Sequence, residues 1–164
     1  MRHILDKAAE VLENYGGKNI FETAENAGVI VWERELGGLK GFYLFENGSR
    51  YIVINEDLDK IMKKVVCAHE LGHDMLHREL SEGGIRENTL FLSGNKTERE
   101  ANLFAAEVLI SDGEILDGIA EFNSISALSA ALGIPEALVN FKLEILNFKG
   151  YNFNCDGAVS DFLR

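Results

Sequence analysis

The chain has 164 residues, of which 46% are hydrophobic, and a formal net charge of −11. This length predicts one domain with a substantial core, and no apolar run approaches the ~18 residues of a membrane helix. The acidic charge opposes nucleic-acid binding, which needs a positive footprint. It is compatible with a basic protein partner, although solubility alone explains it at least as well.

The start of the chain and its cysteines bear on the compartment. The first residues, MRHILD, include an early acidic residue and no apolar region follows them, so they do not predict a signal peptide. Cys67 and Cys155 are too few for a disulfide framework, which fits a reducing cytosol. We therefore expect a cytoplasmic protein. We expect Cys67 to be a small buried hydrophobe and not a metal ligand.

The first third of the chain predicts two helices and a small sheet. The helices are expected over residues 3–14 and 19–27, and Gly28 stops the second one. Three strands are expected, at residues 29–32, 41–45 and 50–55. The last two predict a hairpin around Asn47-Gly48, because Asn-Gly is a strong turn signal. With the helices that follow, this predicts an α+β chain, mostly helical, with a three-stranded antiparallel or mixed sheet.

A long helix is expected from about residue 57 to residue 78. Its large apolar residues recur at steps of three and four, as in a buried helical stripe. His69 and His73 continue that stripe, so we expect both imidazoles to point into the core. Gly72 weakens the helix by about 1 kcal/mol relative to alanine, and it can allow another segment to approach closely.

This helix carries the motif His69-Glu70-Leu71-Gly72-His73, which fits the pattern H-E-x-x-H. Two histidines four residues apart lie on one face of a helix, so they can bind one metal ion. A metal also supplies the partner that two buried polar side chains need. Glu70 lies about 100° around the helix, where it can reach a water on the metal. The motif therefore predicts a zinc hydrolase with Glu70 as general base.

A catalytic zinc needs a third protein ligand, and no third histidine follows at the metzincin distance. We expect a carboxylate from the helix predicted over 97–110, which holds Glu98, Glu100 and Glu107. With Phe104 marking the inward face and about 100° per residue, Glu100 and Glu107 point inward and Glu98 does not. We therefore favour Glu100, with Glu107 as the alternative, although Glu100 can also serve only as a helix cap.

The two ligand-bearing helices are joined by a long connection, residues 80–96, and loops of this length are usually functional or disordered. Further helices are expected near residues 112–120, over 125–132 and over 135–147. The last two resemble a helix-turn-helix, but the second carries one lysine and two glutamates, which suits packing better than a phosphate backbone. We therefore expect no direct contact with nucleic acid.

The segments Ala68–His77 and Glu98–Ala106 resemble the ImmA/IrrE family of metallo-endopeptidases, and the resemblance extends over residues 1–147. It implies a zincin-like minimal metalloprotease fold in which His69, His73 and Glu100 bind zinc and Glu70 is the base. Family members are bacterial, are often encoded on phages or integrative elements, and cleave a helix-turn-helix repressor. The resemblance implies such a repressor as the substrate. The chain departs from the family at Ser111-Asp112-Gly113, where a proline often closes the helix.

We expect one zincin-like domain over residues 1–148 and a loosely ordered tail over 149–164. Peptide hydrolysis also needs a donor for the oxyanion, for which the sequence offers His77, Tyr43, Tyr51 and Arg86 without choosing among them. Two alternatives remain: a non-catalytic regulator of the same fold that binds a repressor or partner protein, and a structural metal site in a binding module. The intact Glu70 argues against the regulator.

Overall fold

The computed structural model describes residues 1–78 and 96–153, and the structural statements below concern these residues. They form seven helices and three strands. The N-terminal elements are α1 (Arg2–Tyr15), α2 (Ile20–Asn26), β1 (Ile30–Arg34), β2 (Gly41–Glu46) and β3 (Ser49–Asn55). The later helices are α3 (Lys60–His77), α4 (Lys96–Leu109), α5 (Asp112–Glu121), α6 (Ile125–Leu132) and α7 (Glu136–Phe148). The expected α+β class, mostly helical with a small sheet, is confirmed.

The sheet is mixed, with strand order β1-β3-β2. β1 pairs with β3 in parallel, and β2 pairs with β3 in antiparallel orientation. Asn47 and Gly48 join β2 to β3 with φ angles of 51° and 77°. Both residues are therefore left-handed, as a two-residue hairpin turn requires, so the predicted hairpin is confirmed. Because β3 is central, both β1 and β2 are edge strands.

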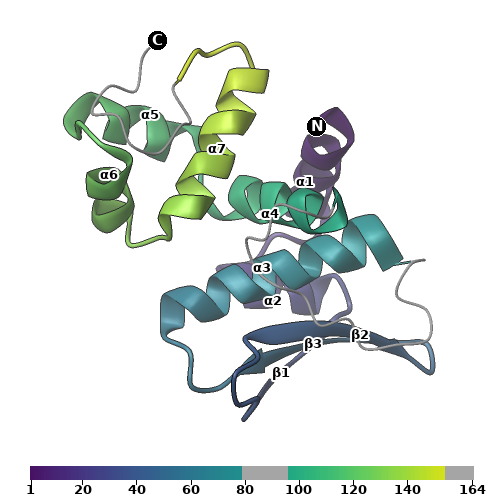
Figure 1. The fold of residues 1–164 in the computed structure, drawn as a ribbon. Helices are drawn as coiled ribbons and strands as arrows, with labels where there is room; N and C mark the ends of the chain where they lie inside the picture. Colours follow the sequence, from purple (N-terminus) through teal and green to yellow (C-terminus); the bar gives the residue numbers. More distant parts are fainter. Residues whose placement is uncertain (79–95, 154–164) are drawn as a thin grey trace.

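One face of this sheet lies against α3 and α2 (Figure 1). Side chains alternate along a strand, and the alternate residues Tyr43, Ile52 and Ile54 are fully or almost fully buried on the helix side. On β1 the alternating pair Ile30 and Trp32 is exposed instead. The helix-covered face therefore holds the core beneath α3.

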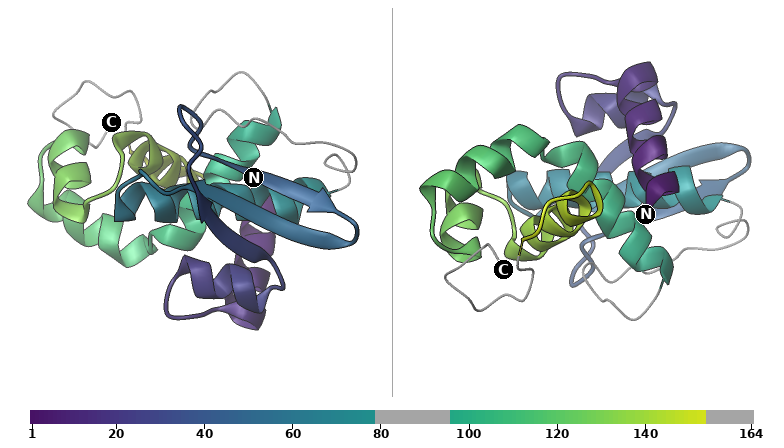
Figure 2. Two further views of the ribbon diagram at one scale, coloured as in Figure 1. Left: turned by 90° about the horizontal axis from the view of Figure 1, so that it is seen from below. Right: turned by 90° about the horizontal axis from the view of Figure 1, so that it is seen from above.

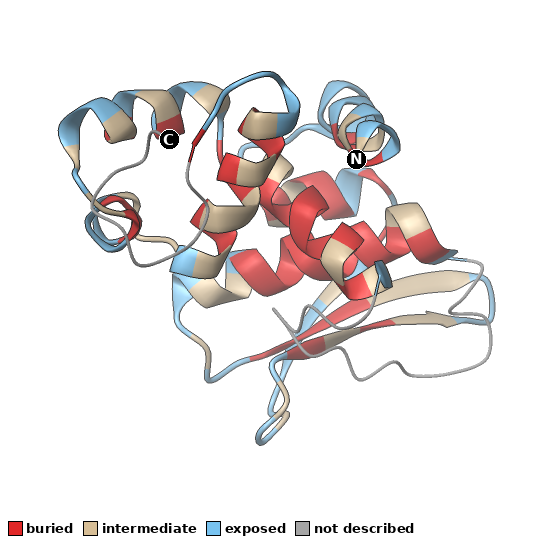
Figure 3. Ribbon diagram, turned by 45° about the horizontal axis from the view of Figure 1, so that its top comes forward, coloured by how far each residue is buried: buried red, intermediate tan, exposed pale blue. Residues whose placement is uncertain are grey.

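The helices α3 and α4 pack against each other in the middle of the molecule, with α1 and α7 also packed on α4 (Figures 1 and 2). Coloured by burial, this central pair is the most continuously buried part of the chain (Figure 3). A Cβ at Gly72 would lie only 3.1 Å from Ala101 Cα. The expectation that Gly72 permits a close approach is confirmed, and the approaching segment is α4.

Ser111 caps the start of α5 and forms a reciprocal capping box with Glu114. Beyond α5, Gly133 takes a left-handed φ of 65° between α6 and α7. The helix-turn-helix-like pair is thus present, but α7 packs on α4 with Lys142 only 1% exposed. The side chain of this lysine is buried inside the protein, as expected for a helix that packs against other helices.

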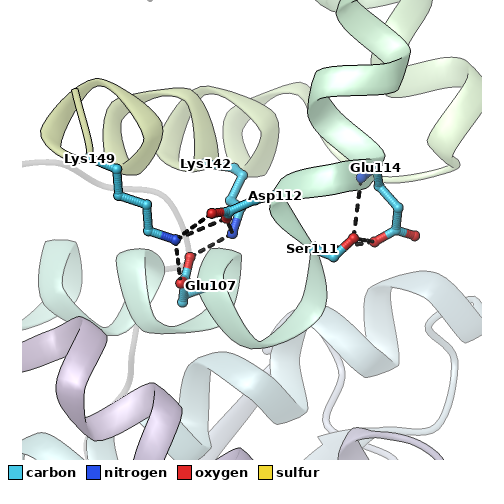
Figure 4. A network of polar contacts seen from close by, with 6 residues as sticks. All are labelled: Glu107, Ser111, Asp112, Glu114, Lys142 and Lys149. Carbon is cyan, nitrogen blue, oxygen red and sulfur yellow. Dashed lines mark hydrogen bonds and ion pairs between the residues drawn. The ribbon is translucent and has the colours of Figure 1, made fainter. Parts of the chain in front are cut away.

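A network of ion pairs ties α7 to α4 and to the start of α5 (Figure 4). Lys142 contacts Glu107 and Asp112, and Lys149 contacts the same two carboxylates. After α7 the chain is packed as far as Phe153, which is 5% exposed and is hydrogen-bonded to Asn147. No helix in the described ranges is long and apolar enough to cross a membrane.

Candidate metal centre

The two motif histidines lie side by side on α3, in the interior. Asp59 caps the helix by accepting from the backbone amides of Ile61 and Met62, so the helix is established ten residues before His69. His69 is 0% exposed and His73 is 2% exposed. Their Nε2 atoms are 3.1 Å apart. The predicted inward orientation of both imidazoles is therefore confirmed.

The carboxylate that the structure brings to these histidines is that of Glu98. Its Oε2 lies 3.3 Å from His69 Nε2, and its Oε1 lies 3.3 Å from His73 Nε2. One ligand atom from each of the three residues lies within 4.8 Å of the other two. The expectation that Glu100 would complete this set is not met by the geometry, and neither is the alternative, Glu107.

The physical reason is that α4 has no single inward face. Every residue from 100 to 106 is buried, because α4 packs against α3, α7 and α1 together. Phe104 is thus a poor marker for the metal-facing side. That side is defined by Glu98 and Asn102, four residues apart, while Glu107 pairs with the lysines of α7.

Asn102 orients the ring of His69 through a hydrogen bond. This residue was not identified from the sequence. It is 0% exposed, and its Oδ1 lies 2.9 Å from His69 Nδ1. Because an amide oxygen only accepts, His69 must donate from Nδ1, which leaves the lone pair on Nε2. That lone pair faces His73 and Glu98. The signal available in the sequence was the four-residue spacing between Glu98 and Asn102.

The pKa shifts of Glu98 and His73 suit metal ligands. Burial raises the pKa of Glu98, but the adjacent imidazoles of His69 and His73 outweigh burial and hold the pKa at about 2. Burial lowers the pKa of His73 and, together with the neighbouring His69 and His77, outweighs the opposite effect of Glu98. An anionic carboxylate and a neutral imidazole are the forms that bind zinc. Two nitrogens and one oxygen from protein form a donor set that can hold a metal ion.

Comparison with known proteins identifies the family. Residues 24–144 match the model of the peptidase M78 family, described as the IrrE N-terminal-like domain. The chain belongs to this family. The predicted resemblance to the ImmA/IrrE family and the zincin-like minimal fold are thereby confirmed. A metallopeptidase family implies a bound metal ion, and the peptidase M78 chain described here offers His69, His73 and Glu98 for it.

Two relatives of this peptidase M78 chain cover most of its length. Uncharacterized immunity region protein 2 of Bacillus phage phi105 is 37% identical over 152 residues, which is 85% of this chain and 95% of that protein. Metallopeptidase ImmA of Bacillus subtilis strain 168 is 26% identical over 144 residues, covering 85% of this chain and 83% of ImmA.

The general base expected for a peptidase M78 member, Glu70, is 0% exposed on α3. It directly follows His69 on the helix. Burial lowers the pKa of His69, but Glu98 and then the charge of Glu70 outweigh burial and raise it. Cys67 is fully buried, and its thiol lies 4.0 Å from the backbone oxygen of Ile20. Burial, and then the charge of Glu70, raise the pKa of this thiol. The prediction that Cys67 is a small buried hydrophobe is confirmed.

Directly after His73, the buried Asp74 connects α3 to the sheet. Its Oδ1 accepts from Tyr43 at 2.8 Å, and its Oδ2 accepts from Arg50 at 2.8 Å. Arg78 adds a third donor at 3.0 Å. The network fixes the helical turn that carries His73 against β2 and β3. Sequence reasoning missed Asp74, because nothing local distinguishes it from a solvated aspartate.

The structure shows the surroundings of three of the four candidates for the oxyanion donor. Tyr43 donates its hydroxyl to Asp74, and burial and this hydrogen bond raise its pKa. Tyr51 packs against Trp32, with ring centroids 4.9 Å apart. His77 lies next to His73, with ring centroids 5.7 Å apart. Arg86, together with nearly all of the expected 80–96 connection, lies outside the described residues.

Proposed function

We propose that this chain is a zinc-dependent endopeptidase that cleaves a regulatory protein. The observation that carries the proposal is the convergence of His69 Nε2, His73 Nε2 and the Glu98 carboxylate, with Glu70 on the same turn of α3. A structural zinc would instead have four protein ligands. Within the described residues, the cluster offers three, which leaves a position for water.

The roles of the residues follow from this arrangement. Zinc, when bound, supplies an activated water and polarises the scissile carbonyl. His69, His73 and Glu98 hold the ion, and Asn102 fixes the orientation of His69. Glu70 takes a proton from the attacking water on its carboxylate and returns it to the nitrogen of the leaving amine. Asp74 holds the His73 turn in place from the side of the sheet.

We propose that the substrate binds along β2. An extended peptide can add to an exposed sheet edge through main-chain hydrogen bonds. β2 is an edge strand, and Tyr43 in the middle of β2 is bonded to Asp74, next to His73. This edge therefore runs beside the turn of α3 that carries the second histidine. β1, the other edge strand, is separated from β2 by β3.

We further propose that the substrate is a helix-turn-helix repressor encoded by a phage or mobile element, and that its cleavage relieves repression in the cytoplasm. Two observations support this. The phage relative is named an immunity region protein, and the Bacillus subtilis relative is named Metallopeptidase ImmA. The net charge of −11 suits a basic DNA-binding partner.

The experiment first determines whether a neighbouring gene encodes a helix-turn-helix repressor, and then incubates that repressor with the purified protein and zinc. Mass spectrometry of the fragments should show one defined cleavage, absent after chelation and absent with Glu70→Gln. Glu13→Gln, which removes an exposed carboxylate on α1, serves as the matched control and should cleave normally. If Glu70→Gln relieves repression in cells as well as wild type, the protein acts by binding and the proteolytic proposal is wrong.

A further inference from the structure

All four histidines of the chain gather at the same end of α3 and α4. His69, His73 and His77 follow one another at four-residue steps on α3, with ring centroids 4.8 and 5.7 Å apart. The fourth, His3, comes from the first turn of α1, which packs against both α3 and α4. The proposed catalytic site uses only His69 and His73, so His77 and His3 require a separate explanation.

Glu100 connects these two remaining histidines. Its Oε2 lies 3.5 Å from His77 Nε2, and its Oε1 lies 3.4 Å from His3 Nε2. The side chains of Glu100 and His77 are 12% and 8% exposed, whereas that of His3 is 61% exposed. Two potential ligands from two other helices, the nearly buried His77 and the exposed His3, therefore flank the two oxygens of the Glu100 carboxylate.

We propose that His77, Glu100 and His3 form a second zinc site, weaker than the first. Imidazole nitrogen and carboxylate oxygen are the donors that zinc prefers among those present. Here each carboxylate oxygen already faces one imidazole. The set is looser than the first, since only His69, His73 and Glu98 among the described residues have all their ligand atoms within 4.8 Å. A zinc ion bound by all three side chains would require the exposed His3 to turn inward.

Ordinary ion pairing is the simpler account of the same contacts, and one neighbour fits it. Lys96 Nζ lies 3.8 Å from Glu100 Oε1, with a side chain 86% exposed. An exposed pair of this kind contributes little free energy, so the lysine gives way easily to a divalent ion. Ion pairing also gives no reason for two histidines from different helices to contact the two oxygens of one carboxylate. His77 is nearly buried, whereas His3 is exposed.

The location predicts an effect on proteolysis, and this part rests on the proposed function. His77 is one helical turn beyond His73, so a zinc ion held there lies directly beside the catalytic one. It would occupy space that the scissile peptide needs. We therefore expect zinc in excess of one equivalent to inhibit cleavage, and His3→Gln to relieve that inhibition.

Equilibrium dialysis against increasing free zinc, with metal measured by mass spectrometry, tests the site without substrate. Wild type should bind two zinc ions per chain in two separated steps, as should the charge control Glu13→Gln. His3→Gln and Glu100→Gln should each lose the weak step and keep the tight one. Glu98→Gln should lose the tight step and keep the weak one.

Three results would overturn the inference: a single zinc step in wild type, an unchanged weak step in His3→Gln, or loss of the tight step in Glu100→Gln. The last would also show that Glu100, and not Glu98, is the third ligand of the first site. Normal proteolysis with a single zinc step rejects the second site and leaves the proposed function standing. Two steps without any proteolysis reject the function and leave the second site standing.

Discussion

The hydrogen bond between Asn102 and His69 allows a quantitative prediction. Asn102 is fully buried, and its Oδ1 lies 2.9 Å from His69 Nδ1. Asn102→Leu keeps the approximate side-chain volume but removes the acceptor. Removing such a partner of a metal-bound histidine typically lowers metal affinity about 10- to 100-fold, which corresponds to ~1.4–2.7 kcal/mol. We expect zinc affinity to fall within this range.

The assay is a competition titration of zinc against a chromophoric chelator, with circular dichroism to verify the fold. Asn102→Asp is the matched control, because its carboxylate still accepts from His69 Nδ1 and should preserve the affinity. A folded Asn102→Leu protein that binds zinc as tightly as wild type would refute the reasoning. It would show that His69 keeps its tautomer and orientation without Asn102.

Three further predictions concern the frame around the site. Gly72→Ala should lower the free energy of unfolding and weaken zinc binding, because the added Cβ would lie 3.1 Å from Ala101 Cα. Overpacking of this kind costs ~1–3 kcal/mol, and the gain in helix propensity from alanine, ~1 kcal/mol, offsets only part of that cost. Lys142→Ala should lower the free energy of unfolding by about 3 kcal/mol in denaturant titration, because it empties a buried position and removes one of the two lysines that pair with Glu107 and Asp112. Asp112→Asn should make stability depend less steeply on pH in the acid range. Burial raises the pKa of Asp112, but Lys142 and Lys149 lower it by more, so that the pKa lies below its ordinary value. A depressed carboxyl pKa adds stability above about pH 4 that is lost as the pH falls.

Each of the three has its own control. Gly113→Ala places a Cβ where nothing lies within 4 Å, so it should lack the penalty of Gly72→Ala; equal effects would rule out the helix contact as the cause. Lys142→Met restores the volume but not the charge, so it should recover only part of the loss seen with Lys142→Ala; full recovery would show that the ion pairs contribute nothing. Asp117→Asn removes an exposed aspartate on α5, and an identical flattening there would contradict the role of the lysine pairs.

Much of the fold was predictable because its signals are local. The Asn47-Gly48 turn fixes the β2–β3 hairpin through two left-handed residues. The stripe of apolar residues on α3 predicted that His69 and His73 would be buried. The order of the strands was not predictable, because β1 pairs with β3 in parallel across the whole hairpin. Only packing against α2 and α3 selects that partner.

The sequence by itself determined the two histidines and the general base of the proposed site. Their relation depends only on the helical repeat, and a helix at this point follows from the Asp59 cap and the apolar stripe. The tertiary structure decided which of three glutamates joins them. Since α4 is buried against α3, α1 and α7 at once, periodicity cannot tell which buried side faces the histidines. The approach of α4 to Gly72 sets that side, turning Glu98 to His69 and His73 and leaving Glu100 to His77 and His3.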